Sequence, residues 1–275
     1  MYAQNFEYAG EQLSDYGMII CSFDSGGTET VSSGSDITFN QVSIANGNHF
    51  LLSSSTYEQS LQCTFQICKN PCIASEQDDM AFTVAEISSV QRWLCRKNQY
   101  HRFKLNQSGY EHIYWNGTFS VKEVQICGQV YGLELTLYTD SPFGYQDEIS
   151  ISEDASKTDY SFDIYDTSDE EGYVYPNVTI EITNTNGCDL YMKNDMDSSR
   201  PLIINNCLYG EVLTLDGKNH MITSSMAHLN LPNDFNYNFP RIFNTYGETK
   251  NTFTLGHDSI CKITMTYSPI RKVGI

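Results

Sequence analysis

The rhythm of residues 210–275 constrains the fold of this chain more than any other feature of its sequence. Apolar and polar residues alternate there in three short stretches. A Gly-containing turn, a loop rich in Asn, Asp and Pro, and a second Gly-containing turn punctuate the region. Alternation with a period of two is typical of strands that bury one face. No residue of this region stands out as a catalytic acid, base or nucleophile, so the pattern favours assembly or binding over chemistry.

The same rhythm extends over most of the 275 residues and predicts a mainly β fold with one helix. The chain holds 19 Tyr and 14 Phe, and aromatic residues suit pleated, half-buried surfaces. Strands are expected at 16–23, 59–68, 110–115, 117–128 and 130–138, and a hairpin at 37–52. From residue 174 onward, strands and turns recur roughly every 8–12 residues, which predicts an antiparallel β-sandwich.

The helix is expected at residues 83–97. Thr83 and Glu86 have the spacing of a capping box, in which each side chain satisfies a backbone N–H of the other residue. Apolar residues then recur at the spacings of three and four that place them on one helical face; they are Val84, Ile87, Val90 and Leu94.

A change in composition divides the chain into two expected domains, 1–143 and 144–275. The turn residues at 139–144 end one strand, and ten acids with a single base lie between Asp147 and Glu171. Such a charge run is typical of a solvated segment. We therefore expect an acidic loop after the boundary, with strands resuming near residue 174.

The formal net charge of −18 excludes a general nucleic-acid-binding surface. Non-specific affinity for DNA depends on Lys and Arg neutralising phosphates, and this chain has 34 acids against 16 bases. An acidic surface is nevertheless compatible with a passage that DNA moves through without adhering.

The lack of a recognisable targeting signal and the odd number of cysteines favour assembly inside a cell. The first residues lack the basic and apolar parts of a signal peptide, and no apolar run reaches the roughly 18 residues of a membrane-spanning helix. Nine cysteines cannot all pair within one chain. Reduced thiols are therefore expected.

A zinc site is the one metal centre that the cysteines suggest. Three residues separate Cys68 from Cys72, Cys63 could supply a third thiolate, and a fourth ligand could come from Cys95, His49 or His101. The competing interpretation is that Cys63 is a buried strand residue, because it is in phase with its apolar neighbours. We expect free thiols, with no metal and no cofactor.

No motif of a known enzyme class occurs, and the six His residues are isolated in the sequence. The tightest group of acids could serve in glycoside hydrolysis or calcium binding, but it lacks the spacing of a calcium loop; it contains Asp166, Asp169, Glu170 and Glu171. We expect a non-enzymatic protein.

Two residue groups are candidates for contacts with partners. A basic concentration around the helix end suggests contacts between subunits, or else a solvated helix end that complements the helix dipole; it contains Arg92, Arg96, Lys97, Arg102 and Lys104. A set of aromatics in the second domain could stack on sugars, or else pack in the core; it contains Tyr191, Tyr209, Phe235, Tyr237 and Phe239. The second group keeps open a carbohydrate-binding or adhesive module as an alternative function.

Short motifs along the whole chain resemble the distal tail proteins of long-tailed bacteriophages, the Dit family. The resemblance is strongest at residues 131–137 and 141–144, where the family has its domain junction. Weaker motifs keep their order along the chain and lie at residues 6–10, 15–20, 92–94, 215–220, 233–236, 263–267 and 271–272.

The resemblance implies a structural role in the virion. Family members form a homo-hexameric ring at the end of the phage tail and are assembled in the host cytoplasm. An N-terminal β domain, with a helix and an extended hairpin, builds the ring, and a galectin-like β-sandwich lies outside it. The implied partners are other copies of the chain, the major tail tube protein, the tail-tip hub protein and receptor-binding or baseplate proteins, while DNA passes through the ring. Residues 37–52 are the candidate for the extended hairpin.

Overall fold

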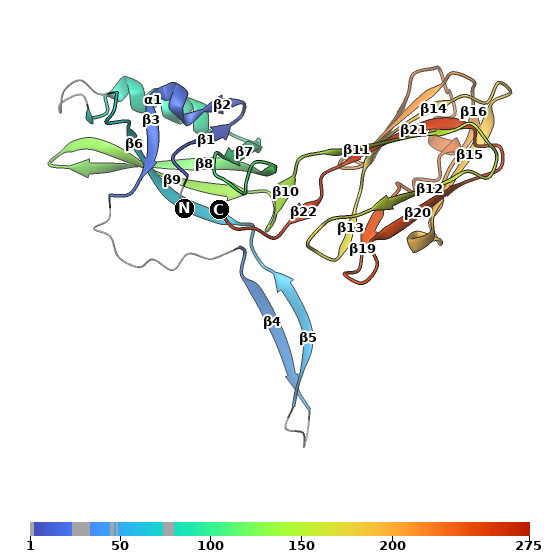
Figure 1. Cartoon of the computed structure of the whole chain (residues 1–275), viewed down its shortest axis with the longest axis horizontal. Coiled ribbons are helices and arrows are strands. Elements are labelled where there is room, and N and C mark those ends of the chain that lie inside the picture. The colour runs from blue at the N-terminus through green and yellow to red at the C-terminus, as the bar shows by residue number, and fades with distance from the viewer. Residues whose placement is uncertain (1–2, 24–33, 45–46, 48, 74–79) are drawn as a thin grey trace. The chain divides into compact units, whose positions relative to one another are not determined.

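The computed structural model describes residues 3–23, 34–44, 47, 49–73 and 80–275. The chain divides into two compact units: unit 1 comprises Met1–Gln146 together with Arg271–Ile275, and unit 2 comprises Asp147–Ile270. Both are built mainly from antiparallel strands (Figure 1). Within the described ranges, no helix has both the length and the apolar character needed to cross a membrane.

Unit 1 contains one large antiparallel sheet with the strand order β2-β1-β7-β8-β9-β6-β3. A short strand, β10, pairs with both β8 and β22. The bounds are Phe6–Tyr8 (β1), Glu11–Gln12 (β2), Met18–Cys21 (β3), Gln62–Lys69 (β6), His101–Leu105 (β7), Ile113–Ile126 (β8), Gln129–Thr139 (β9), Gly144–Gln146 (β10) and Ile270–Arg271 (β22), with a 3-10 turn at Leu13–Tyr16 (η1).

The helix of unit 1, α1, spans Val84–Leu94, within the predicted range. Its start is the predicted capping box: the Glu86 backbone N–H donates to Thr83 Oγ1 at 3.3 Å, and the Thr83 backbone N–H donates to Glu86 Oε2 at 2.7 Å. The helix ends before residue 97 because Cys95 leaves the helical region of backbone space (φ −91°, ψ 68°). Its buried face contains Ile87, Val90, Trp93 and Leu94.

An aromatic cluster fills the space between α1 and the sheet. Phe6 lies at its centre, with its ring centroid 5.6 Å from Trp93, 5.4 Å from Phe103 and 5.9 Å from Phe119. The indole Nε1 of Trp93 donates to the Tyr8 carbonyl at 3.0 Å, so the buried polar group is satisfied. Aromatic pairs at such distances add to the stabilisation from burial alone.

The last five residues of the chain belong to unit 1. Val273 and Ile275 pack against the core of unit 1, and β22 pairs with β10. Compared with the expected domains 1–143 and 144–275, unit 1 extends three residues further, to Gln146, and also includes residues 271–275. A boundary placed by composition does not register that a chain returns to its first unit, because the return is made by backbone pairing and two apolar side chains.

Unit 2 is a β-sandwich of a five-stranded sheet, β11-β21-β14-β17-β18, and a four-stranded sheet, β12-β20-β15-β16, with the small pair β13-β19 beside them. The bounds are Ile149–Ala155 (β11), Ser161–Tyr165 (β12), Gly172–Val174 (β13), Asn177–Ile182 (β14), Cys188–Asn194 (β15), Leu202–Cys207 (β16), Val212–Asp216 (β17), Met221–Ser224 (β18), Ile242–Asn244 (β19), Lys250–Leu255 (β20) and Cys261–Tyr267 (β21). Short helical turns lie at Asp195–Asp197 (η3) and Leu231–Asp234 (α2).

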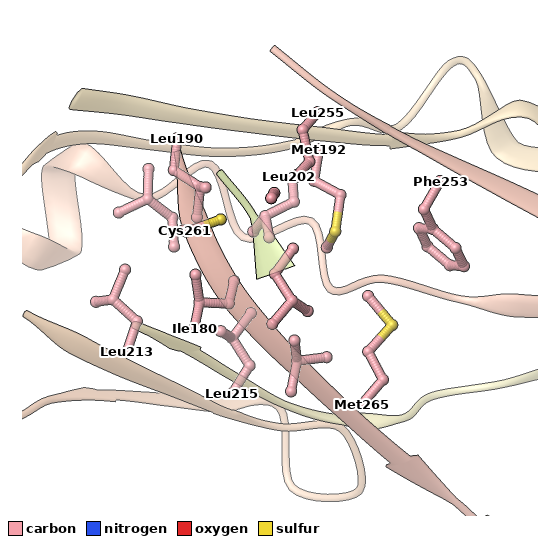
Figure 2. Close-up of a cluster of buried hydrophobic side chains, with 14 of the residues drawn as sticks. Ile180, Leu190, Met192, Leu202, Leu213, Leu215, Phe253, Leu255, Cys261 and Met265 are labelled. Atoms are coloured by element: carbon pink, nitrogen blue, oxygen red, sulfur yellow. The ribbon is translucent and has the colours of Figure 1, made fainter. Parts of the chain in front are cut away.

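Alternation along the strands forms the core between the two sheets of unit 2. Ile180 of β14 and Met265 of β21 come from one sheet, and Leu190, Met192 and Phe253 come from the other (Figure 2). All five side chains are at most 2% exposed. The predicted antiparallel β-sandwich is confirmed, because side chains of alternate positions from both sheets meet in one core.

The first part of the acidic segment is structured, which corrects the expected solvated loop there, while residues 166–171 lie outside the strands. Residues 149–165 contribute β11 and β12, and the segment alternates between buried and exposed positions. Phe162 and Ile164 are buried, while Asp163 between them is exposed. The number of acids does not reveal this alternation, because a strand can carry acids on its exposed face while the side chains of its other face pack in the core.

Candidate assembly surface

A hairpin of unit 1 exposes a series of apolar side chains; it is formed by β4 (Ile37–Ser43) and β5 (Phe50–Tyr57). It is a separate two-stranded sheet, and among the described residues neither strand pairs with any other strand (Figure 1). The hairpin predicted at 37–52 is present, and its second strand continues to Tyr57. A bulge between Asn40 and Gln41 shifts the register near the middle.

Both faces of the hairpin carry apolar side chains. Phe39 and Val42 lie three residues apart on one strand and therefore point to opposite faces. Val42 pairs directly with Leu51 across the two strands. The exposed fractions are large: 59% for Phe39, 54% for Val42, 69% for Phe50, 58% for Leu51 and 56% for Leu52.

A hairpin with this many exposed apolar side chains gains little stability on its own in water. A two-stranded sheet alone is at best marginally stable, and open strand edges can pair with other chains. Soluble proteins rarely leave a large contiguous apolar patch exposed unless it is a contact site. Since both faces carry apolar side chains, burying them all would take contacts on more than one side of this hairpin.

The base of the hairpin is fixed to the body of unit 1. Tyr57 packs edge-to-face on Phe143 with 4.8 Å between ring centroids, and Ser35 Oγ donates to the Pro142 carbonyl at 3.2 Å. A cavity of about 290 Å³ lies there, lined in part by Ile37 and by both aromatic rings. The hairpin is thus anchored at one end and exposed along its length.

The basic candidates fall on two elements of unit 1. Arg92 lies in the last turn of α1, and Arg96 lies two residues beyond its end. The guanidinium of Arg96 is 3.7 Å from Glu11 and donates through Nε to the Trp93 carbonyl at 3.0 Å. Lys97, just beyond the helix, is exposed.

On β7, Arg102 and Lys104 alternate with the buried Phe103 and Leu105 and therefore face away from the core. The Arg102 guanidinium lies over the Tyr114 ring, 3.9 Å from its centroid. Lys104 lies opposite Glu7 in the register of β1 and β7. Arg102 and Lys104 thus have an aromatic ring and an acid beside them within the same chain. Contacts of these bases with another subunit remain a proposal.

The five aromatic candidates of unit 2 do not form one exposed platform. Tyr209 and Tyr237 are 59% and 61% exposed, and Tyr191 is partly buried. Phe235 and Phe239 are buried in the sandwich core, only 3% and 7% exposed. Their ring faces are occupied by packing, which leaves two of the five well placed to meet a sugar.

The thiols and acids considered for metal binding are dispersed. In the part of the chain that the structure describes, no three His, Cys, Asp or Glu side chains come together in a way that could hold a metal ion. The Cys63 thiol lies 3.9 Å from the Ile275 carbonyl, and Cys72 is exposed. Asp166 is buried, where its carboxylate accepts hydrogen bonds from Ser168 and Asn244.

Comparison with family models assigns both parts of the chain. Residues 1–141 match a family described as the phage tail protein N-terminal domain, and residues 143–267 match one described as the phage tail C-terminal domain. The chain belongs to this family of phage tail proteins. It is accordingly a component of the virion tail.

Solved structures share the fold of this tail protein over nearly its whole length. One is SPP1 Dit (gp 19.1), described as a paradigm of the hub adsorption apparatus in phages that infect Gram-positive bacteria. It has a TM-score of 0.66 and 12% identity, over 96% of this chain and 98% of that one. A chain of the phage P2 baseplate in its activated conformation with Ca has a TM-score of 0.53 and 8% identity, over 97% and 98%. No curated protein matches the sequence. The tail protein is thus Dit-like in fold, as the sequence motifs predicted.

Proposed function

We propose that this tail protein forms a homo-hexameric ring that joins the tail tube to the tip hub and to receptor-binding or baseplate proteins. The observation that carries the proposal is the β4–β5 hairpin, whose two apolar faces need a partner. The partner is another copy of the chain, since every copy brings the same uncovered hairpin.

A ring follows from the kind of contact that such a hairpin makes. When a hairpin of one copy covers a different surface on the next copy, the contact is head-to-tail, and head-to-tail contacts generate closed rings if the rotation between copies closes. Hairpin burial would supply the apolar part of the interface. Six copies is the number that the Dit resemblance implies.

The charges of the chain suggest a second contribution. The basic residues at the end of α1 and on β7 stand out in a chain with net charge −18, so they complement acidic surface on a neighbouring copy or tail protein. An acidic lining would also let DNA pass through the ring without adhering. No catalytic step is part of this proposal.

The proposed partners follow from the tail context. SPP1 Dit is described as part of a hub adsorption apparatus, and the P2 chain is part of a baseplate, so both neighbours belong to assemblies. For this chain we propose the tail tube protein and the tip hub protein as axial partners and receptor-binding proteins as peripheral partners. The carbohydrate-binding alternative has less support, because Phe235 and Phe239 are buried.

Ring formation can be tested with the purified full chain. Light scattering after size-exclusion chromatography, together with negative-stain microscopy, should show a closed ring at high protein concentration. In a matched variant, residues 41–53 are replaced by an Asn-Gly turn, which keeps Asn40 opposite Ser54 and favours a tight hairpin. This variant should be monomeric and folded. A full chain that stays monomeric, both alone and mixed with its tail tube protein, would contradict the proposal.

A further inference from the structure

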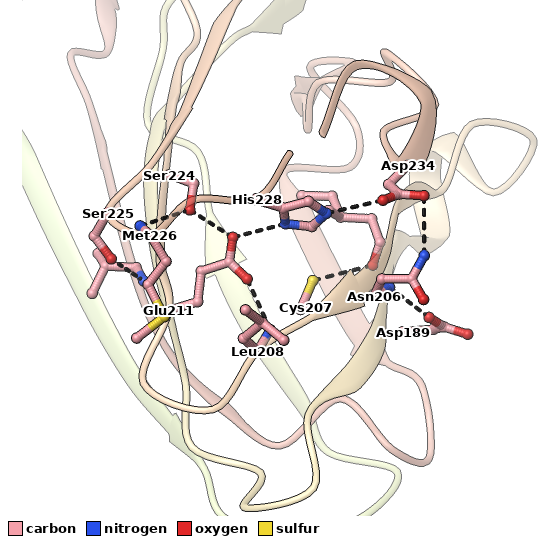
Figure 3. Close-up of polar contacts among 12 residues, drawn as sticks. Asp189, Asn206, Cys207, Leu208, Glu211, Ser224, Ser225, Met226, His228 and Asp234 are labelled. Carbon is pink, nitrogen blue, oxygen red and sulfur yellow. Dashed lines mark hydrogen bonds and ion pairs between the residues drawn. The ribbon is translucent and has the colours of Figure 1, made fainter. Parts of the chain in front are cut away.

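A buried histidine in unit 2 is held between two carboxylates (Figure 3). His228 Nδ1 lies 2.8 Å from Glu211 Oε1, and His228 Nε2 lies 3.0 Å from Asp234 Oδ2. The side chain of His228 is 4% exposed, that of Glu211 is fully buried and that of Asp234 is 10% exposed. The three residues come from the turn before β17, the loop after β18, and α2.

The surroundings of both carboxylates are polar but contain no further cation. Ser224 Oγ donates to Glu211 Oε1 at 2.6 Å, and the Leu208 backbone N–H donates to Glu211 Oε2 at 2.8 Å. Asn206 Nδ2 donates to Asp234 Oδ1 at 3.1 Å. Within the described residues, neither carboxylate forms an ion pair with Lys or Arg, so the imidazole is the only group there that can balance their charge.

The remaining acids near this network belong to the adjacent strands. Asp189 of β15 accepts a hydrogen bond from the Asn206 backbone, and the Cys207 thiol of β16 donates to the Ile204 carbonyl. The side-chain amide of Asn230 also lies near Asp234, at 3.4 Å. All titratable neighbours are therefore acidic or neutral, and none competes with His228 for either carboxylate.

With both carboxyl groups ionised, the number of protons available for the two hydrogen bonds fixes the charge of the ring. A neutral imidazole carries one N–H, and its other nitrogen is an acceptor. In this site both ring nitrogens face carboxylate oxygens, so the neutral form would leave one lone pair against a buried carboxylate. Only the imidazolium donates in both directions. Leaving a buried charge without its partner is costly.

We propose that His228 is a proton-dependent latch: its imidazolium ties the segment 225–234 to the sandwich, and loss of one proton releases that segment. The segment joins β18 to the sandwich core, which the adjacent Phe235 enters. Met226, near its start, is 40% exposed and Leu229 is 95% exposed, so apolar packing holds these two side chains little, while Leu231 packs against the core. The latch therefore determines where these exposed side chains lie.

The titration behaviour of the two partners agrees with this geometry. Burial opposes the charge of His228, but the hydrogen bonds to Glu211 and Asp234 outweigh it and raise the pKa of His228 above its ordinary 6.5. Burial also opposes the charge of Glu211, while hydrogen bonds from Ser224, Leu208 and His228 lower the pKa of this carboxyl below 4.5. The latch is thus closed below the ordinary pKa of 6.5 and opens as pH rises through the raised pKa of His228 in the folded chain.

Amide hydrogen exchange of the full chain, corrected for the intrinsic pH dependence of exchange, tests the latch. We expect the protection of segment 225–234 to fall by tenfold or more between pH 6 and pH 9, while β14 keeps its protection. In His228→Gln, protection of the segment should be low at both pH values. His257→Gln is the matched control, because His257 pairs with Asp159 at 3.2 Å on the surface and should leave the segment unchanged.

Two results would overturn the proposal. One is constant protection of segment 225–234 from pH 6 to pH 9 in the natural chain. The other comes from nitrogen NMR of the natural chain at pH 6, which does not depend on whether any variant folds. We expect both ring nitrogens of His228 to be protonated, and a neutral tautomer at that pH would refute the latch.

Discussion

Truncating Phe50 in the exposed hairpin should weaken assembly without weakening the fold. Full burial of a Phe side chain is worth up to about 3 kcal/mol, and 69% of this side chain is still exposed within one chain. A partner that covers it therefore recovers roughly 2 kcal/mol, and Phe50→Ala should weaken each contact about 30-fold. The free chain loses little, about 0.5 kcal/mol or less, because the ring is not part of a core.

Sedimentation velocity over a range of protein concentrations measures this effect, with thermal unfolding recorded in parallel. Tyr165→Ala in β12 is the matched control, because that aromatic ring is 61% exposed and lies in unit 2. We expect Phe50→Ala to need a much higher concentration to assemble than the control, with similar melting temperatures. Unchanged assembly of Phe50→Ala, or a fall in melting temperature typical of a core truncation, would refute the assignment of the hairpin as the contact surface.

Three further outcomes are expected. Thr83→Ala removes the cap of α1 and should cost about 1 kcal/mol, seen as a lower denaturant midpoint with an unchanged slope. The stability that His228 contributes is complete below its ordinary pKa of 6.5 and is lost as pH rises through its raised folded value, whereas the contribution of Glu211 is lost as pH falls through its lowered pKa. Calorimetry of the natural chain should therefore show that the melting temperature of unit 2 falls at both acidic and alkaline pH. In His228→Gln the fall at alkaline pH should be smaller. Burial raises the pKa of the Cys207 thiol to about 12, so a thiol reagent at pH 8 should label the exposed Cys72 in the native protein and Cys207 only after unfolding.

Local signals in the sequence predicted much of the fold. The capping box at Thr83 and the alternation in residues 210–275 each act over a few residues, so sequence alone specifies them. The acidic strands β11 and β12 were missed because charge was weighed over a window of 25 residues, while burial alternates residue by residue. Strand order was beyond prediction, since it depends on pairings between segments far apart in the chain.

The functional surfaces were predicted less evenly. The hairpin was recognised from its turn residues, but not the exposure of both of its faces, because that depends on which other strands pair with it. The network of Glu211, His228 and Asp234 gave no signal, since its members are 17 and 6 residues apart and belong to no motif. Phe235 and Phe239 resembled sugar-stacking residues only because an aromatic ring in a loop reads the same whether it faces solvent or the core.

The return of residues 271–275 to unit 1 affects the order in which the protein can mature. The strand β22 follows all of unit 2 in the chain, so the first unit cannot form its β10–β22 pairing before unit 2 has been synthesised. A chain cut short anywhere in the second unit would therefore lack both that pairing and the apolar side chains of Val273 and Ile275. If those residues are needed for assembly, incomplete translation products would be excluded from the growing tail without any separate proofreading step.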